Sequence, residues 1–120
     1  MKKRMRLARR RMNHIMSELN HALFLAGSQE INLRLIREEA GLRLQIQAEF
    51  APENLPVMER MATLLQPAVR DPALVESYWE LAGEEQYTSD SEMALVGQML
   101  DGAVVNLAGR TVRMNLYIAF

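Results

Sequence analysis

Two runs of strictly alternating residues constrain the fold of this chain more than any other feature. From Leu42 to Phe50 apolar residues alternate with polar ones, and Ile31 to Leu35 repeats the pattern. An alternation of period two places all the apolar side chains on one face of a strand. Between the runs lies Glu38-Glu39-Ala40-Gly41, and we expect Gly41 to supply the positive φ of a tight turn. The stretch 30–50 is therefore predicted to form a β-hairpin whose apolar face the rest of the chain must cover.

A second alternating pattern closes the sequence. Thr111 to Phe120 alternates in the same way, and Ala103 to Leu107 precedes it across Ala108-Gly109-Arg110, which reads as a turn. Two hairpins predict a four-stranded sheet, mainly antiparallel or mixed. Its polar face would carry the side chains of Arg34, Arg43, Gln45, Gln47, Arg113, Asn115 and Tyr117.

The segments outside the hairpins have helical periodicity. Apolar residues recur every three or four positions from near Arg4 to Leu25, and Gly27 fits the C′ position of that helix. Three further helices are expected: one capped by Asn54, one from Asp71-Pro72 to Gly83, and one opened by a capping box, Ser89 to Glu92. The predicted fold is α+β, a two-layer sandwich with the helices on one face of the sheet.

Composition limits the class of protein. A chain of 120 residues is expected to form one domain, 1–120. It has no cysteine, which excludes disulfides and thiolate metal sites, and no apolar run long enough to span a membrane. No secretory signal is evident at the N-terminus. We therefore expect a cytoplasmic protein without a membrane span.

The basic residues are concentrated at one end. Seven of the 14 lie between Lys2 and Arg11, while the remainder of the chain carries all 15 acidic residues. This basic helical extension, about 1–11, is either a solvated helix start or a contact for phosphate or an acidic partner. No aromatic residue is interleaved with it, which argues against stacking on single-stranded nucleic acid. The candidate partner-binding residues are Arg9, Arg10, Arg11, Arg43, Arg113 and Tyr117.

Two local strings, with the order of elements, resemble a known family. Ser17 to Leu23 (SELNHAL) leads into the strand from Glu30 to Leu35, and Met93 to Asp101 is followed by Gly109 to Leu116 (GRTVRMNL). Both are similar to the ATP-binding domain of histidine kinases, anti-sigma-factor serine kinases and related ATPases. The resemblance implies the histidine-kinase ATPase fold and a role in bacterial signal transduction.

The Mg²⁺-binding signature of that family is incomplete here. Family members hold Mg²⁺ through an Asn one helical turn after a Glu. If Glu18 takes the Glu position, the Asn position is Ala22; if Asn20 takes the Asn position, the Glu position is Met16.

Both nucleotide loops of the family also differ. The Asp-x-Gly-x-Gly loop, expected after Phe50, reads Ala51-Pro52-Glu53-Asn54. The glycine-rich loop before the last helix, at 88–92, reads Thr-Ser-Asp-Ser-Glu. Phosphate binding needs donors and close backbone approach. We therefore expect a degenerate domain without nucleotide, cofactor or metal, acting as a non-catalytic regulatory or protein-interaction domain whose partner is a response regulator or a sigma-type regulator, with a homodimer as a further possibility.

Two alternatives remain. The first is an enzyme: a histidine phosphotransferase using His14 or His21, which lie seven residues apart on the first helix, or an ATP-binding kinase or anti-sigma factor. The second is a nucleic-acid binder that uses the N-terminal arginines.

Overall fold

The computed structural model describes residues 2–67 and 89–120. The described elements are α1 (Lys2–Leu25), β1 (Ile31–Arg37), β2 (Gly41–Glu49), a 3₁₀ turn (Pro52–Asn54), α2 (Leu55–Leu65), α4 (Ser89–Met99), β3 (Gly102–Ala108) and β4 (Thr111–Ala119). The expected helix from Asp71 to Gly83 lies outside the described residues.

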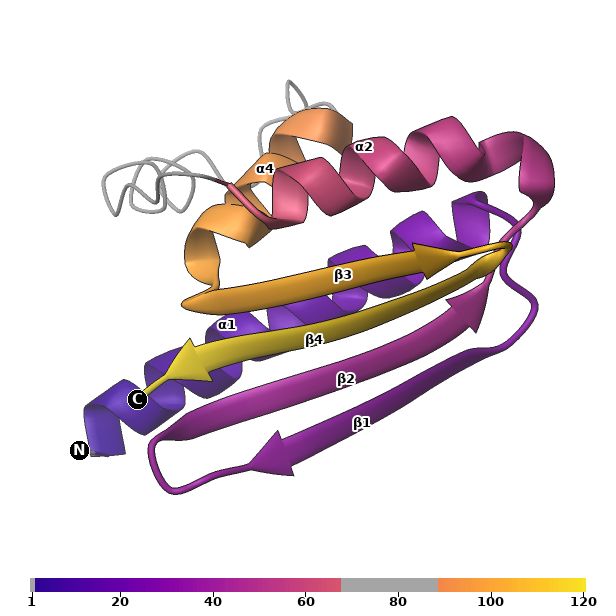
Figure 1. The fold of residues 1–120 in the computed structure, drawn as a ribbon. Coiled ribbons are helices and arrows are strands. Elements are labelled where there is room, and N and C mark those ends of the chain that lie inside the picture. The colour runs from indigo at the N-terminus through magenta and orange to yellow at the C-terminus, as the bar shows by residue number, and fades with distance from the viewer. Residues whose placement is uncertain (1, 68–88) are drawn as a thin grey trace.

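The two hairpins join into one antiparallel sheet of order β1-β2-β4-β3 (Figure 1). The central strands β2 and β4 pair in register, with Leu44 opposite Leu116 and Gln45 opposite Asn115. β1 and β3, which are the first strand of each hairpin, form the two edges of the sheet. Joining the early and late hairpins through β2 and β4 confirms the predicted four-stranded sheet.

All the described helices lie on one face of the sheet, so the chain forms an α+β sandwich of two layers (Figure 1). The core between the layers is drawn from every described helix and from the alternating residues of β2 and β4. Its fully buried side chains include Met12, Ile15, Leu19, Leu23, Leu44, Phe50, Met58, Leu65, Val96, Val112 and Leu116. We call the opposite face of the sheet the open face.

The C-terminus of α1 is closed as the sequence predicts. Gly27 has φ 97°, and the N–H of Ser28 donates to the carbonyl oxygen of Leu23 over 3.0 Å. These are features of a Schellman motif. The expected capping by Asn54 is different: its side chain makes no cap hydrogen bond to α2 and instead donates to the carbonyl oxygen of Ala26 over 2.9 Å. Asn54 therefore ties the start of α2 to the end of α1.

The prediction for Gly41 is wrong. Only Gly27 and Gly109 among the described residues have positive φ, and Gly41 is the first residue of β2. Glycine is required there for space, because a Cβ would lie 2.4 Å from the carbonyl oxygen of Ile118 and 2.5 Å from the ring of Tyr117.

Candidate functional site

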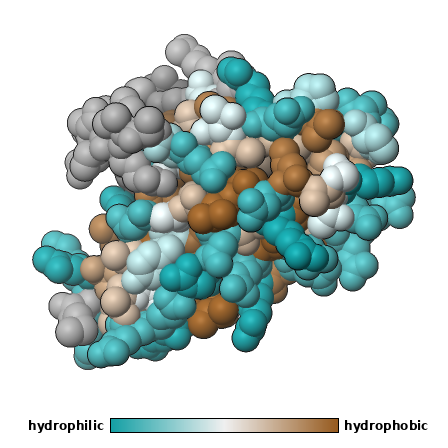
Figure 2. Space-filling view, viewed as in Figure 1, coloured by the Kyte–Doolittle hydropathy of each residue, from teal (hydrophilic) through white to brown (hydrophobic). Residues whose placement is uncertain are grey.

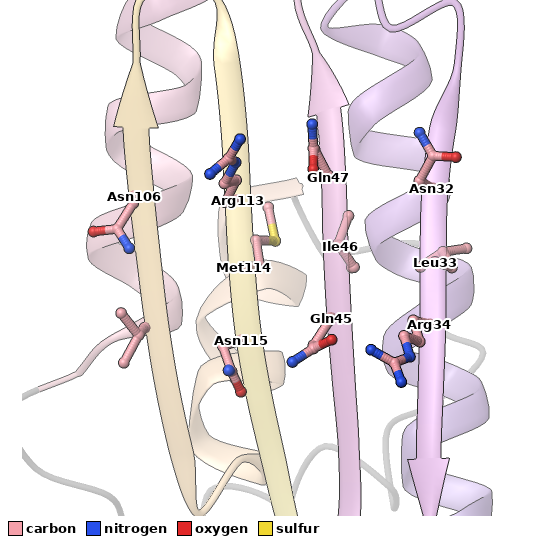
Figure 3. Close-up of a pocket in the computed structure, with 11 residues that line it drawn as sticks. Asn32, Leu33, Arg34, Gln45, Ile46, Gln47, Asn106, Arg113, Met114 and Asn115 are labelled. Atoms are coloured by element: carbon pink, nitrogen blue, oxygen red, sulfur yellow. The ribbon is translucent and has the colours of Figure 1, made fainter.

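The open face is covered by polar side chains in the register that the alternation predicts. Pairing across the sheet places Gln47 beside Arg113 and Gln45 beside Asn115. Figure 3 shows these side chains with those of β1 and β3. They line a shallow hollow of about 550 Å³. The polar residues around the hollow are Asn32, Arg34, Gln45, Gln47, Asn106, Arg113 and Asn115.

One arginine of the open face is fully engaged within the fold. Arg43 donates from Nε to Glu38 over 2.8 Å and from Nη1 to Asn115 over 2.7 Å. Its guanidinium also lies 4.9 Å from the ring centroid of Tyr117, and the hydrogen bond to Glu38 raises the pKa of Arg43. Arg43 and Tyr117 are both among the residues expected to contact a partner. Through these contacts they stabilise one end of the open face.

The other two arginines of the face have no such partner. Neither Arg34 nor Arg113 forms an ion pair with any residue in 2–67 or 89–120, and both are exposed. They lie on β1 and β4 with β2 between them, and because Arg34 pairs with Gln45 and Arg113 with Gln47, they are also offset by two residues, about 12 Å apart in all. Each of these two guanidinium groups can donate two parallel hydrogen bonds to a carboxylate.

A second concave site lies among the helices. A pocket of about 270 Å³ is lined by residues of α1, α2 and α4. Its described lining is mainly apolar, with Ala22, Leu25, Val57, Met61 and Met93 among the residues. The ionisable groups that line it are Glu18, His21 and Glu92.

The two carboxyl groups of this pocket interact with each other. Burial, a hydrogen bond to Glu18 and the negative charge of Glu18 raise the pKa of Glu92, whereas His14 and His21 lower it. Burial lowers the pKa of His14, and the charge of Glu92 opposes that effect. The polar end of the pocket is therefore formed by the two interacting carboxyl groups of Glu18 and Glu92, with His21 beside them. The sequence offered Glu92 as part of a capping box and of the acidic stretch 88–92, but no local pattern could have shown that it meets Glu18.

The remaining predicted site residues lie on α1. Arg9 and Arg10 are exposed, whereas the Nε atom of Arg11 is buried. His14 is half-buried and His21 is exposed at the rim of the pocket. These residues of α1 all lie in the helix layer. The other candidate residues, Arg43, Arg113 and Tyr117, lie on the sheet. The basic extension does not project freely, because Ala8 is buried in the core.

A basic groove marks the first turns of α1. Lys2, Arg6 and Arg9 line it together with Arg37, over a floor that includes Leu42 and Phe120. Its volume is about 450 Å³. The groove brings the N-terminal arginines to the start of β2 and the end of β4.

Comparison with known proteins adds no assignment: no family model, no curated protein and no solved structure matches this chain. Across the described ranges, no three His, Asp or Glu side chains gather in a way that could hold a metal ion. None of the described helices combines the length and the apolar character needed to cross a membrane.

Proposed function

We propose that this chain is a non-catalytic protein-interaction domain that shares the histidine-kinase ATPase fold, has lost nucleotide binding, and regulates a partner in bacterial signalling. The fold and signalling role rest on the resemblance of its two strings to that family. The loss of nucleotide binding and the interaction surface rest on the charges of the pocket and of the open face.

The charge of the helix pocket is the observation that carries the proposal. By the resemblance, a nucleotide would lie between the first and last helices, where Glu18 and Glu92 line the pocket. If Glu18 takes the family's Glu position, Ala22 stands where the family has its Mg²⁺-binding Asn, and Ala22 lines the same pocket. No Lys or Arg is among its described lining residues. The two carboxyl groups would repel a triphosphate, and His21 is the one described lining residue that could offset their charge.

The open face supports a protein partner. It is solvent-facing over four strands, and Figure 2 shows a largely hydrophilic surface on this side of the molecule, broken by a few hydrophobic patches. Val104 is 54% exposed on β3 and gives the face an apolar contact beside Asn106. A polar surface with exposed arginines and a small apolar contact is typical of transient interfaces. The free Arg34 and Arg113 select a partner with a carboxylate-rich surface, such as a response regulator.

Site-specific photo-crosslinking in the source cells tests this proposal. A photoreactive residue at Gln47 or Asn106 on the open face is expected to trap the same acidic protein. The matched control position is Glu59, which is exposed on α2 in the other layer. Changing Arg34 and Arg113 together to Glu should abolish the adduct because charge complementarity is reversed. Equal adducts from Glu59, or adducts unaffected by the charge reversal, would refute the open face as the interface.

A further inference from the structure

The two edges of the sheet differ. At the β3 edge, α2 lies alongside the strand, and the Gln66 side-chain oxygen accepts a hydrogen bond from the N–H of Val105 over 3.2 Å (Figure 1). At the β1 edge, no residue in 2–67 or 89–120 bonds to the outer side of the strand. An uncovered edge strand is a template for pairing with another strand.

The backbone groups that face outward from β1 can be assigned. The N–H of Glu38 donates to the carbonyl oxygen of Gly41 over 2.8 Å, which makes this a hydrogen-bonded pair. Bonded and non-bonded pairs alternate along an antiparallel ladder. Arg34 and the other even-numbered residues of β1 therefore bond to β2, and Ile31, Leu33 and Leu35 direct their N–H and C=O groups away from the sheet.

The same odd-numbered residues leave apolar surface uncovered. Leu33 lies opposite Ile46 and Leu35 opposite Leu44, so both side chains are on the helix-covered face of the sheet. Leu33 is nevertheless 39% exposed and Leu35 45% exposed, whereas Ile46 and Leu44 are buried. The helix layer thus covers β2 and stops short of β1. Figure 3 shows Leu33 on this outermost strand.

We propose that β1 pairs antiparallel with β1 of a second copy of this chain, about a two-fold axis at Leu33. In this register Leu33 faces Leu33 of the second copy, and Ile31 faces Leu35 on either side. The exposed leucines of both copies then cover one another. On the open face Arg34 faces Asn32 of the second copy and lies diagonal to both its Glu30 and its Arg34.

Charge and apolar contact together favour this register among the symmetric ones. An axis at Arg34 would place the two Arg34 side chains directly opposite one another and would also oppose Glu30 to Glu38, and like charges in these positions are destabilising. An axis at Leu35 would keep the contact between the two Leu35 side chains but would oppose Leu33 to Arg37. An axis at Asn32 would oppose Glu30 to Arg34 but would pair Leu35 with the polar Gln29. Of these four axes, only the one at Leu33 opposes both exposed leucines to apolar residues without opposing like charges. The product is a closed dimer with a continuous eight-stranded sheet.

Single cysteines test the register, because the chain has no cysteine of its own. Leu33→Cys should form a disulfide-linked dimer on mild oxidation, since the two residues face each other across the axis within the reach of a disulfide. Leu35→Cys is the matched control: its counterpart lies four residues further along the strand, about 13 Å away. Cross-linking of Leu35→Cys, or none of Leu33→Cys, would refute the register.

Sedimentation equilibrium of the unmodified chain tests the dimer itself. Leu33→Arg and Leu35→Pro should each raise the dissociation constant about tenfold or more. Leu35→Pro removes an N–H that points away from β2, so the monomer keeps the hydrogen bonds between β1 and β2. This variant therefore tests the dimer even if Leu33→Arg fails to fold. Val104→Arg, a substitution of an exposed apolar residue on the other edge strand, should leave the dimer intact. A monomeric parent chain, or a monomer produced by Val104→Arg, would overturn the proposal.

Discussion

At the scale of single residues, the pair Glu18 and Glu92 links the protonation of the pocket to the stability of the fold. Because the pKa of Glu92 is raised above its ordinary value of 4.5, the folded protein binds this proton more tightly than the unfolded chain does. The pair therefore contributes stability below pH 4.5 that is lost as the pH rises through the raised pKa.

Glu92→Gln should raise the melting temperature at pH 7, because the amide keeps a hydrogen-bond donor for Glu18 and removes one negative charge. The gain should be a few degrees at most, since the site is largely solvated, and should shrink as the pH falls to 4.5. Thermal unfolding followed by circular dichroism at both pH values measures it. Glu59→Gln, at an exposed position on α2, is the control. A gain that persists below pH 4.5 would show that the carboxyl pair is not its cause.

The sequence did not predict the roles of residues that contact distant parts of the chain. Gly41 was assigned a turn role from its place in a hairpin, but the crowding that requires it comes from Tyr117 and Ile118. Asn54 fits a cap by its position, yet its amide bonds to Ala26. Gly27, whose role depends only on its own helix, was predicted correctly.

At the scale of elements, the contact between α2 and α4 depends on Gly97. A Cβ at this position would lie 2.2 Å from the carbonyl oxygen of Leu64 and 3.2 Å from the Cα of Leu65. Both neighbours are backbone atoms of α2, which cannot move without shifting the helix.

Gly97→Ala should therefore destabilise the fold by roughly 1–3 kcal/mol, the usual cost of overpacking. Gly102→Ala is the matched control, because a Cβ there meets only the Tyr117 side chain, at 3.7 Å. Urea unfolding of the two variants compares them directly. A Gly97→Ala variant as stable as Gly102→Ala would mean that the helices do not approach as closely as described.

The strands were predictable because their alternation is local, and the structure confirms both hairpins to within a residue or two. The exposure of Leu33 and Leu35 was not predictable from the sequence. Their alternation is the same as that of the buried Leu44 and Ile46, and only the extent of the helix layer separates the two pairs.

At the scale of the whole molecule, the helix pocket and the hollow of the open face carry charged groups of opposite sign. The helix pocket presents Glu18 and Glu92, while the open face presents Arg34 and Arg113. The sequence predicted the open-face residues, because a face follows from alternation. It did not predict the order β1-β2-β4-β3 or the pocket, because the pairing of β2 with β4 and the meeting of α1 with α4 join residues more than 60 positions apart.

Calorimetric titration with ATP and Mg²⁺ tests the central claim, that the pocket among α1, α2 and α4 does not take a nucleotide. The intact chain should give no binding heat up to about 1 mM ATP at pH 7.5. ADP should behave in the same way, because the carboxyl pair would repel its phosphates as well. A micromolar dissociation constant for either nucleotide, weakened by substitutions at Glu18 or Met93 in the pocket, would contradict the account.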